Sequence, residues 1–332
     1  MNVTASIVIP TRNRAETLYA CLNSLVNQTI PTEQFEVIVV DNGSNDHTSD
    51  VVSEYANALN LSYVYTRVLG LHVGRHEGMR RAKADILIFA DDDIEANPNW
   101  IRTIVDSFDA PEVALVGGNN HPMFECAPPD WLMRWWQRPV HKGRALGYLS
   151  ILDFGRGQFE IDPGYIWGCN FSIRRDVLLA AGGFHPDALP SDRLRFRGDG
   201  ETHVSNYIRK SKHLALFNSD ASVRHRVPAA RMRPDYIAQR AYAQGISDSY
   251  THARSSGGPE SGPSQVARRL TRLRSHLQQR LKGLLPNDEV GRVLWATQLT
   301  ARSAYHQGYN FHQRELRRDP ALLEWVLRKD YL

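Results

Sequence analysis

The sequence predicts an α/β protein, with a mostly parallel sheet flanked by helices on both faces and an α-helical extension at the C-terminal end. Two observations lead to this prediction. Short apolar runs alternate with segments of helical periodicity through residues 6–116, which is typical of repeated βα units. Helical periodicity returns near residue 233 and continues to the end of the chain. The 332 residues are 42% hydrophobic, so there is enough apolar mass for a sizeable core.

The apolar runs rich in β-branched residues predict five strands in this first part, at residues 6–10, 35–40, 61–68, 86–90 and 113–116. Apolar positions at helical spacing predict four helices, at residues 14–26, 51–59, 73–83 and 98–108. Polar clusters at 11–14, 41–46 and 91–93 each follow a predicted strand. Because ligands bind beyond the carboxyl ends of parallel strands, we expect these clusters to form one site.

Residues 119–163 interrupt the alternation. Aromatic residues, Pro and Gly dominate this irregular region, which predicts either a long loop or a small subdomain. Further patterns predict a strand at 165–173, a helix at 200–210 and a strand at 214–217. We expect residues 1–232 to form one domain and residues 233–332 to form an α-helical region.

The helical region carries most of the positive charge. The formal net charge is +4, and residues 251–332 contain 14 Lys and Arg against 7 Asp and Glu, while the remainder contains 26 against 29. Helices are expected at 236–250, 265–285, 292–309 and 321–329, with a linker at 255–264. The segment 265–285 combines a leucine stripe with six basic side chains, which fits packing within the chain, homodimerisation, or contact with an anionic membrane surface.

The location expected from the sequence is the cytoplasm, with peripheral contact to the inner face of the membrane as an option. Three scattered cysteines, Cys21, Cys126 and Cys169, form no CxxC pair and argue against a disulfide framework. We find no signal-peptide pattern and no apolar run of membrane-spanning length.

The strongest chemical feature is the triplet Asp91, Asp92 and Asp93 at the end of a predicted strand. Adjacent carboxylates repel one another, and a divalent cation relieves that repulsion. Oxygen ligands suit Mg²⁺ or Mn²⁺ bound together with substrate phosphates. Because alternate residues of a strand face one side, Asp91 and Asp93 are expected to act together while Asp92 points away. The alternative is an acidic turn exposed to solvent.

Other polar residues follow the first two strands. Asp41 can accept a hydrogen bond from the imide N–H of a uracil or thymine ring, or it can simply cap the next helix. The loop formed by Pro10, Thr11, Arg12, Asn13 and Arg14 can line a base pocket or cap a helix. Arg75 is a candidate contact for the base or the diphosphate.

Several segments together resemble family 2 glycosyltransferases of the GT-A fold. The segments are Ser6-Ile7-Val8-Ile9-Pro10-Thr11-Arg12-Asn13-Arg14, Val39-Val40-Asp41-Asn42-Gly43-Ser44-Asn45-Asp46, Gly74-Arg75-His76-Glu77-Gly78, Phe89-Ala90-Asp91-Asp92-Asp93, Trp167-Gly168-Cys169-Asn170 and Gly182-Gly183-Phe184. Each motif alone is weak, but their order and spacing over residues 4–230 are specific. His76 departs from the family pattern, which has Asn at that position.

The resemblance implies an inverting transferase that uses a nucleotide diphosphate sugar, with UDP favoured, in glycan or glycoconjugate biosynthesis. It implies Mn²⁺ or Mg²⁺ bound by Asp91 and Asp93, a late histidine at His225 near the metal or diphosphate, and donor contacts from the residues named above. The family's general base follows Gly-Gly-Phe, and here that position corresponds to Glu201, with Asp199 as the second candidate. A positioned carboxylate is needed because the acceptor hydroxyl loses its proton as it attacks.

The acceptor is left open between a lipid-linked glycan, a polysaccharide end and a small metabolite. Four tryptophans offer an aromatic acceptor platform or simple packing: Trp131, Trp135, Trp136 and Trp167. A nucleotidyltransferase of related fold is one alternative, although the loop after the first strand has no glycine. A nucleic-acid-binding protein is another, although the basic residues are confined to the tail.

Overall fold

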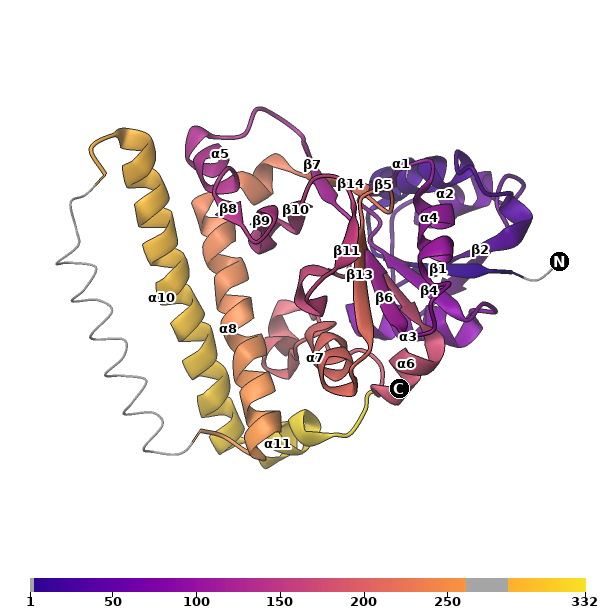
Figure 1. Cartoon of the computed structure of the whole chain (residues 1–332). Coiled ribbons are helices and arrows are strands. Elements are labelled where there is room, and N and C mark those ends of the chain that lie inside the picture. The colour runs from indigo at the N-terminus through magenta and orange to yellow at the C-terminus, as the bar shows by residue number, and fades with distance from the viewer. Residues whose placement is uncertain (1–2, 261–285) are drawn as a thin grey trace.

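The central sheet begins with four parallel strands that follow the predicted apolar runs. The computed structural model describes residues 3–260 and 286–332 (Figure 1). The four strands are β1 Ala5–Thr11, β2 Phe35–Asp41, β3 Leu61–Tyr65 and β4 Ile86–Ala90. β1 pairs in parallel with both β2 and β4, and β2 pairs in parallel with β3. The helices between them are α1 Ala15–Val26, α2 Thr48–Glu54, α3 Leu71–Arg81 and, after β4, α4 Trp100–Ser107. The predicted α/β fold is therefore confirmed.

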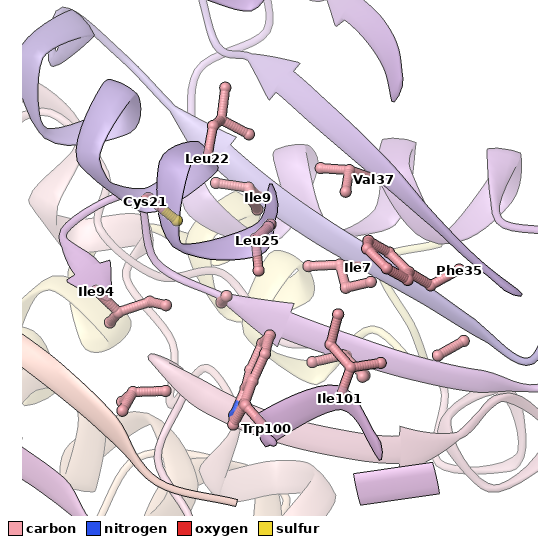
Figure 2. Packing of buried hydrophobic residues seen from close by; sticks show 14 of the residues in the cluster. Ile7, Ile9, Cys21, Leu22, Leu25, Phe35, Val37, Ile94, Trp100 and Ile101 are labelled. Atoms are coloured by element: carbon pink, nitrogen blue, oxygen red, sulfur yellow. The ribbon is translucent and has the colours of Figure 1, made fainter. Parts of the chain in front are cut away.

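Helices cover both faces of this sheet, as the alternation of apolar residues along each strand requires. On β1, Ile7 and Ile9 pack into a cluster with α1, α2 and α4, whereas Val8 packs into a second cluster on the opposite face with α3. Figure 2 shows the first cluster, in which Leu22 and Trp100 approach the strand residues from two different helices. α3 approaches β1 closely because Gly78 has no side chain, since a Cβ there would lie 2.2 Å from a methyl carbon of Val8.

The rest of the central sheet adds antiparallel pairings at the other edge. Its strands are β6 Val113–Gly117, β11 Gln158–Glu160, β12 Asn170–Arg174 and β13 Leu214–Asn218, and the full order is β11-β13-β6-β12-β4-β1-β2-β3. β12 runs antiparallel to β4 and β6. The strand predicted at 165–173 starts later than expected because Pro163–Tyr165 forms a 3₁₀ turn. Two further helices, α6 Arg175–Ala180 and α7 Thr202–Ser211, cover the face that α3 occupies.

The irregular region 119–163 contributes four strands to a second sheet, which two strands from outside the region complete. The six strands of this sheet have the order β5-β14-β7-β10-β9-β8. They are β5 Ile94–Ala96, β14 Val223–Val227, β7 Asn120–Phe124, β10 Ile151–Asp153, β9 Gly143–Leu146 and β8 Pro139–Val140. A short helix, α5 Asp130–Trp136, lies between β7 and β8. These strands are too short, and too rich in Gly, Pro and His, to give a clear period-two pattern.

The described residues of the C-terminal part contain three helices, namely α8 Pro234–Ser256, α10 Glu289–Arg318 and α11 Pro320–Leu327. α8 and α10 run side by side (Figure 1) and approach closely at two glycines. A Cβ at Gly245 would lie 2.0 Å from the Tyr305 carbonyl oxygen, and one at Gly308 would lie 2.0 Å from that of Tyr242. Both helices share a core with α5 and β9, so a domain boundary after residue 232 stays a proposal.

The predicted helix 265–285, and the end of the linker before it, lie outside the described residues. Among the residues that are described, no helix has both the length and the apolar character that a membrane span requires.

Candidate active site

A cavity of about 420 Å³ opens at the carboxyl ends of β1 and β4. Nine of the residues predicted for the site line it: Pro10, Thr11, Arg12, Arg14, Arg75, Asp91, Asp92, Glu201 and His225. Four others do not line it: Asn13, Asp41, Asp93 and Asp199. The strand-end clusters at 11–14 and 91–93 and the late segments around residues 201 and 225 therefore meet at one place, as the topology predicts.

The three aspartates after β4 occupy different environments. Asp91 is partly exposed to the cavity, whereas Asp92 and Asp93 are buried. Asp92 leaves the other two, as predicted, but it does not face solvent, because it accepts a hydrogen bond from the Thr11 hydroxyl at 2.7 Å and pairs with Arg14 at 2.6 Å. Burial raises the pKa of Asp92 to about 7, although Arg14 opposes the shift.

Arginines compensate the repulsion expected within this triplet. Arg14 also pairs with Asp93 at 2.5 Å, and Arg231 pairs with the same Asp93 oxygen at 3.2 Å. Arg75 lies 3.7 Å from Asp91. These arginines therefore offset part of the repulsion among the three aspartates with charges from the protein itself.

An acidic and imidazole cluster nevertheless remains where a cation is expected. Asp91, Asp93 and His225 each offer one ligand atom, and these atoms all lie within 4.8 Å of one another. Asp93 Oδ1 is buried and accepts no hydrogen bond from the described residues, and His225 Nε2 lies 3.4 Å from it. Burial raises the pKa of Asp93, but His225, Arg14 and Arg231 outweigh it and hold that pKa well below the usual range.

A short strand that the sequence analysis missed builds this cluster. β5 begins directly after Asp93 and pairs with β14, with Ile94 opposite His225. This register places the imidazole beside the Asp93 carboxylate, although 132 positions separate the two residues. A three-residue strand leaves no periodic signal in the sequence, so only the resemblance pointed to His225.

Glu201 stands at the wall of the cavity, at the start of α7. Its Oε1 accepts a hydrogen bond from the Gly168 N–H at 3.2 Å, and its Oε2 lies 3.3 Å from Arg75. The Arg75 guanidinium is buried over the Phe184 ring. The guanidinium lies between Asp91, at 3.7 Å, and Glu201, at 3.3 Å.

Asp199 faces the interior of the protein. Its Oδ1 lies 2.7 Å from His185 Nδ1, and its Oδ2 accepts a hydrogen bond from the Thr251 hydroxyl at 2.6 Å. Both oxygens are therefore engaged by internal partners. Of the two candidate bases, only Glu201 meets the cavity.

Two of the residues expected near the base of the donor, Asp41 and Asn13, bind other parts of the protein. Asp41 accepts hydrogen bonds from the Tyr63 hydroxyl at 2.6 Å and the Ser44 N–H at 2.7 Å. Asn13, whose φ of 53° is left-handed, accepts a hydrogen bond from the Asn45 N–H and thereby ties the first loop to the second. The neighbouring Asn42 reaches the cavity instead.

His76 has a structural contact in place of the family's Asn. Its Nε2 accepts a hydrogen bond from the Phe184 N–H at 2.9 Å, and its ring stacks on that of Phe184. Burial lowers the pKa of His76 to about 3, so the ring is neutral at physiological pH. The imidazole thus supports the phenylalanine on which Arg75 rests.

Helix α8 contributes residues that the sequence analysis did not single out. Tyr236 and Arg240, one helical turn apart, line the cavity, and Asp187 and Ser150 approach from other segments. Arg240 forms no ion pair or side-chain hydrogen bond with the described part of the chain. The only signal for these residues is the i, i+4 spacing of polar side chains on α8, which is also typical of an exposed helix face.

Comparison with known proteins gives consistent relatives. The model of a family described as Glycosyl transferase family 2 matches residues 6–179. Validoxylamine A glucosyltransferase of Streptomyces hygroscopicus subsp. jinggangensis is 32% identical over 198 residues, covering 55% of this chain and 47% of that protein. Glucosyl-dolichyl phosphate glucuronosyltransferase of Haloferax volcanii is 24% identical over 252 residues, covering 74% and 76%. The chain spans about half the length of the validoxylamine relative.

One solved structure supports the same fold. A mannosyltransferase from Pyrobaculum calidifontis, in complex with GDP-Man and Mn²⁺, aligns with a TM-score of 0.53 at 18% identity. The alignment covers 98% of this chain and 86% of that chain. At this identity the likeness shows the GT-A fold alone.

Proposed function

Since its residues 6–179 match the family model, this protein belongs to glycosyl transferase family 2 and is a glycosyltransferase, and we propose that it moves a sugar from a nucleotide diphosphate donor to an acceptor hydroxyl with inversion at the anomeric carbon. The observation that carries the proposal is the convergence of Asp91, Asp93 and His225 at one side of a cavity whose wall holds Glu201. A donor-phosphate side and a base side are thus both present at the strand ends.

The residues fit a divalent cation, Mn²⁺ or Mg²⁺. Asp91, Asp93 and His225 would hold it, and the buried Asp93 Oδ1 without a hydrogen-bond donor supports this assignment. When bound, such a cation supplies a Lewis acid that offsets the charge of the leaving diphosphate. Two carboxylates and one imidazole leave coordination positions for phosphate oxygens and water.

The charges around the cavity support a donor and a cation bound together. Five arginines are present: Arg12, Arg14, Arg75, Arg231 and Arg240. Five carboxylates oppose them when buried Asp93 is included: Asp91, Asp92, Asp93, Asp187 and Glu201. A diphosphate and a divalent cation carry opposite charges, so binding both preserves this balance, whereas binding either alone leaves an excess in a partly buried site.

Glu201 is the proposed general base. The Gly168 N–H and Arg75 orient its carboxylate, so that it can take the proton of the acceptor hydroxyl while that oxygen attacks the anomeric carbon. Asp199 is the less favoured candidate, because its oxygens bind His185 and Thr251.

For the nucleobase of the donor and for the acceptor, we propose classes of molecule rather than single compounds. We favour uridine, with Asp41 and the loop Pro10–Asn13 near the base. The two relatives are named for a glucosyl and a glucuronosyl transfer, one to validoxylamine A and one to a dolichyl-linked glucose. A small polyhydroxylated molecule and a lipid-linked glycan are therefore both reasonable acceptors. Peripheral membrane contact or dimerisation through residues 265–285 stays a proposal.

The test is calorimetric titration of the full chain with UDP, GDP and dTDP, each with and without Mn²⁺. We expect one nucleotide to bind only when Mn²⁺ is present, and the identity of that nucleotide assigns the base. Binding that is equally tight without metal would remove the role given to Asp91, Asp93 and His225. A lack of binding to all three nucleotides in Mn²⁺ would overturn the proposed reaction.

A further inference from the structure

A second cavity, of about 470 Å³, lies on the other side of Glu201. Four residues line both cavities, namely Tyr148, Ser150, Glu201 and Arg240. The second cavity contains none of the aspartates of the 91–93 segment. The proposed base therefore stands between a charged cavity and a cavity of different composition.

Four segments that are far apart in the sequence form this second cavity. One is the 3₁₀ turn η2 Gly147–Leu149, which ends at Ser150 with a left-handed φ of 54°. The others are residues 164–167, the start of α7 and one face of α8, where Tyr236, Arg240 and Gln244 follow one another at intervals of four residues. Tyr236 lines the first cavity, Arg240 lines both cavities, and Gln244 lines the second. One face of α8 therefore extends from the donor side to the other side of Glu201.

Aromatic and hydroxyl-bearing side chains give the second cavity its chemistry. The indole N–H of Trp167 donates a hydrogen bond to the Gly164 carbonyl at 2.9 Å, so the surface left for a ligand is apolar. The Tyr148 hydroxyl makes no hydrogen bond with the described residues and can donate to a ligand. Burial and the charge of Asp248 raise the pKa of Tyr148, so the hydroxyl keeps its proton. An apolar ring face surrounded by hydroxyl and amide groups matches a sugar or cyclitol.

The charges of this cavity favour a neutral occupant. Arg209 forms a two-pronged pair with Asp162 and is thereby neutralised. Glu201 pairs with Arg75, which also lies near Asp91, and Arg240 carries a charge opposite to that of Glu201, so neither sign is in clear excess. An acidic sugar or a phosphorylated acceptor would add a negative charge next to Glu201, with no free cation beyond Arg240 to offset it.

We propose that this second cavity is the acceptor subsite and that it binds a neutral polyhydroxylated ring, a sugar or a cyclitol, with the attacking hydroxyl directed at Glu201. This inference rests on the proposed function, because it takes Glu201 as the base. In the reaction the acceptor oxygen forms a bond to the anomeric carbon, and the bond from that carbon to the phosphate oxygen breaks. The electron pair leaves with the nucleotide diphosphate, and the hydroxyl proton passes to Glu201.

The test measures acceptor binding separately from donor chemistry. Saturation-transfer NMR on the full chain, with and without UDP and Mn²⁺, would use two neutral probes, myo-inositol and trehalose, and two anionic probes, glucuronate and glucose 6-phosphate. We expect a neutral probe to bind and the anionic probes to bind more weakly. Stronger binding of the anionic probes, or no binding of either neutral probe, would overturn the inference.

Two variants locate the subsite. Tyr148→Phe and Gln244→Ala each remove one polar group, and we expect each to weaken binding of the neutral probe by about 3- to 10-fold, the range for one hydrogen bond. Tyr242→Phe and Gln239→Ala change the same residue types on α8 outside both cavities and serve as controls. Equal binding in all four variants would place the acceptor elsewhere.

The outcomes for the two proposals are distinguishable. If UDP, GDP or dTDP binds with Mn²⁺ but no neutral ring binds, the acceptor inference fails while the proposed function stands. If a neutral ring binds but no nucleotide binds, the proposed function fails. With UDP-glucose as donor, both cavity variants are expected to raise the acceptor KM and to leave the donor KM within about 2-fold.

Discussion

The cavities on the two sides of Glu201 are lined by different kinds of residues. On the donor side, loops that follow parallel strands bring together a dense ion-pair network, in which Arg14 joins Asp92 to Asp93 and Arg231 binds Asp93 again. On the other side, the turn η2, the segment 164–167 and two helices present Trp167, Tyr148 and amide or hydroxyl groups with few charges. A diphosphate is common to all nucleotide-sugar donors, whereas acceptors differ. The charged side of Glu201 thus suits the donor, and we call it the proposed donor wall. The aromatic side suits the acceptor, and we call it the proposed acceptor wall.

The largest effect is expected on the donor wall. Asp93→Asn removes the carboxylate that links the metal cluster to Arg14 and Arg231. We expect Mn²⁺-dependent nucleotide affinity to fall by at least ~100-fold, because one of two carboxylate ligands is lost. Calorimetry measures the change, and Asp109→Asn, an exposed residue outside both cavities, is the control. Unchanged metal-dependent binding would remove Asp93 from the proposed metal site.

The next prediction concerns the boundary between the two walls. Glu201→Gln keeps the shape of the side chain and removes its basicity, so transfer should fall by about 10²- to 10⁴-fold while nucleotide affinity stays within a few-fold. Asp199→Asn should instead lower stability, by about 1–3 kcal/mol, because it weakens the contacts to His185 and Thr251. Rate assays and thermal unfolding of both variants separate these effects. Normal turnover by Glu201→Gln would transfer the role of base to Asp199.

Gly168 on the donor wall and Gly147 on the acceptor wall allow a matched pair of substitutions, for which we expect smaller effects. A Cβ at Gly168 would lie 2.1 Å from Arg75 Nη2, so Gly168→Ala should displace the arginine and reduce kcat by about 10- to 100-fold. At Gly147 the nearest atom to a Cβ is Trp167 Cζ2, at 3.9 Å, so Gly147→Ala fits. It should raise only the acceptor KM, by a few-fold. Steady-state kinetics with varied donor and acceptor test the pair, and the same loss of kcat in both variants would contradict the division into two walls.

The donor wall was largely predictable because its signals are local. Asp91 follows a buried strand within one continuous segment, and the order of parallel strands then determines which loops meet. The role of Arg14 was not predictable, since the sequence does not show that its guanidinium spans two aspartates. The position of His225 next to Asp93 depends on the register of the three-residue strand β5, which has no periodic pattern.

The acceptor wall was not predictable for a different reason. Tyr148 and Arg240 meet only because α8 packs against the 3₁₀ turn η2. Neither residue belongs to a motif, and the short strands of region 119–163 have no sequence pattern that would predict how the two residues are arranged. The contacts between these residues come from tertiary packing, which a spacing rule does not describe.

The last prediction concerns the pH dependence of stability, which follows from four buried histidines. Burial lowers the pKa of His72 and His185 to about 4 and that of His76 to about 3, all near α3 and Phe184, and it lowers that of His312 on α10 to about 4. Between pH 6.5 and about 4 these rings bind protons in the unfolded chain but not in the folded protein. Stability is therefore full above pH 6.5 and is lost as the pH falls, by up to ~1.4 kcal/mol per pH unit for each ring.

His76→Asn tests this effect on the donor wall, because an amide oxygen can accept the Phe184 N–H without titrating. Denaturant unfolding at several pH values gives the slope of the free energy of unfolding against pH. In His76→Asn this slope should be smaller than in the unchanged protein, by up to the equivalent of one proton. His47→Asn, at an exposed position, should leave the slope as it is. If His76→Asn leaves the slope unchanged as well, His76 does not titrate on unfolding, and the acid sensitivity belongs to His72, His185 and, behind the acceptor wall, His312.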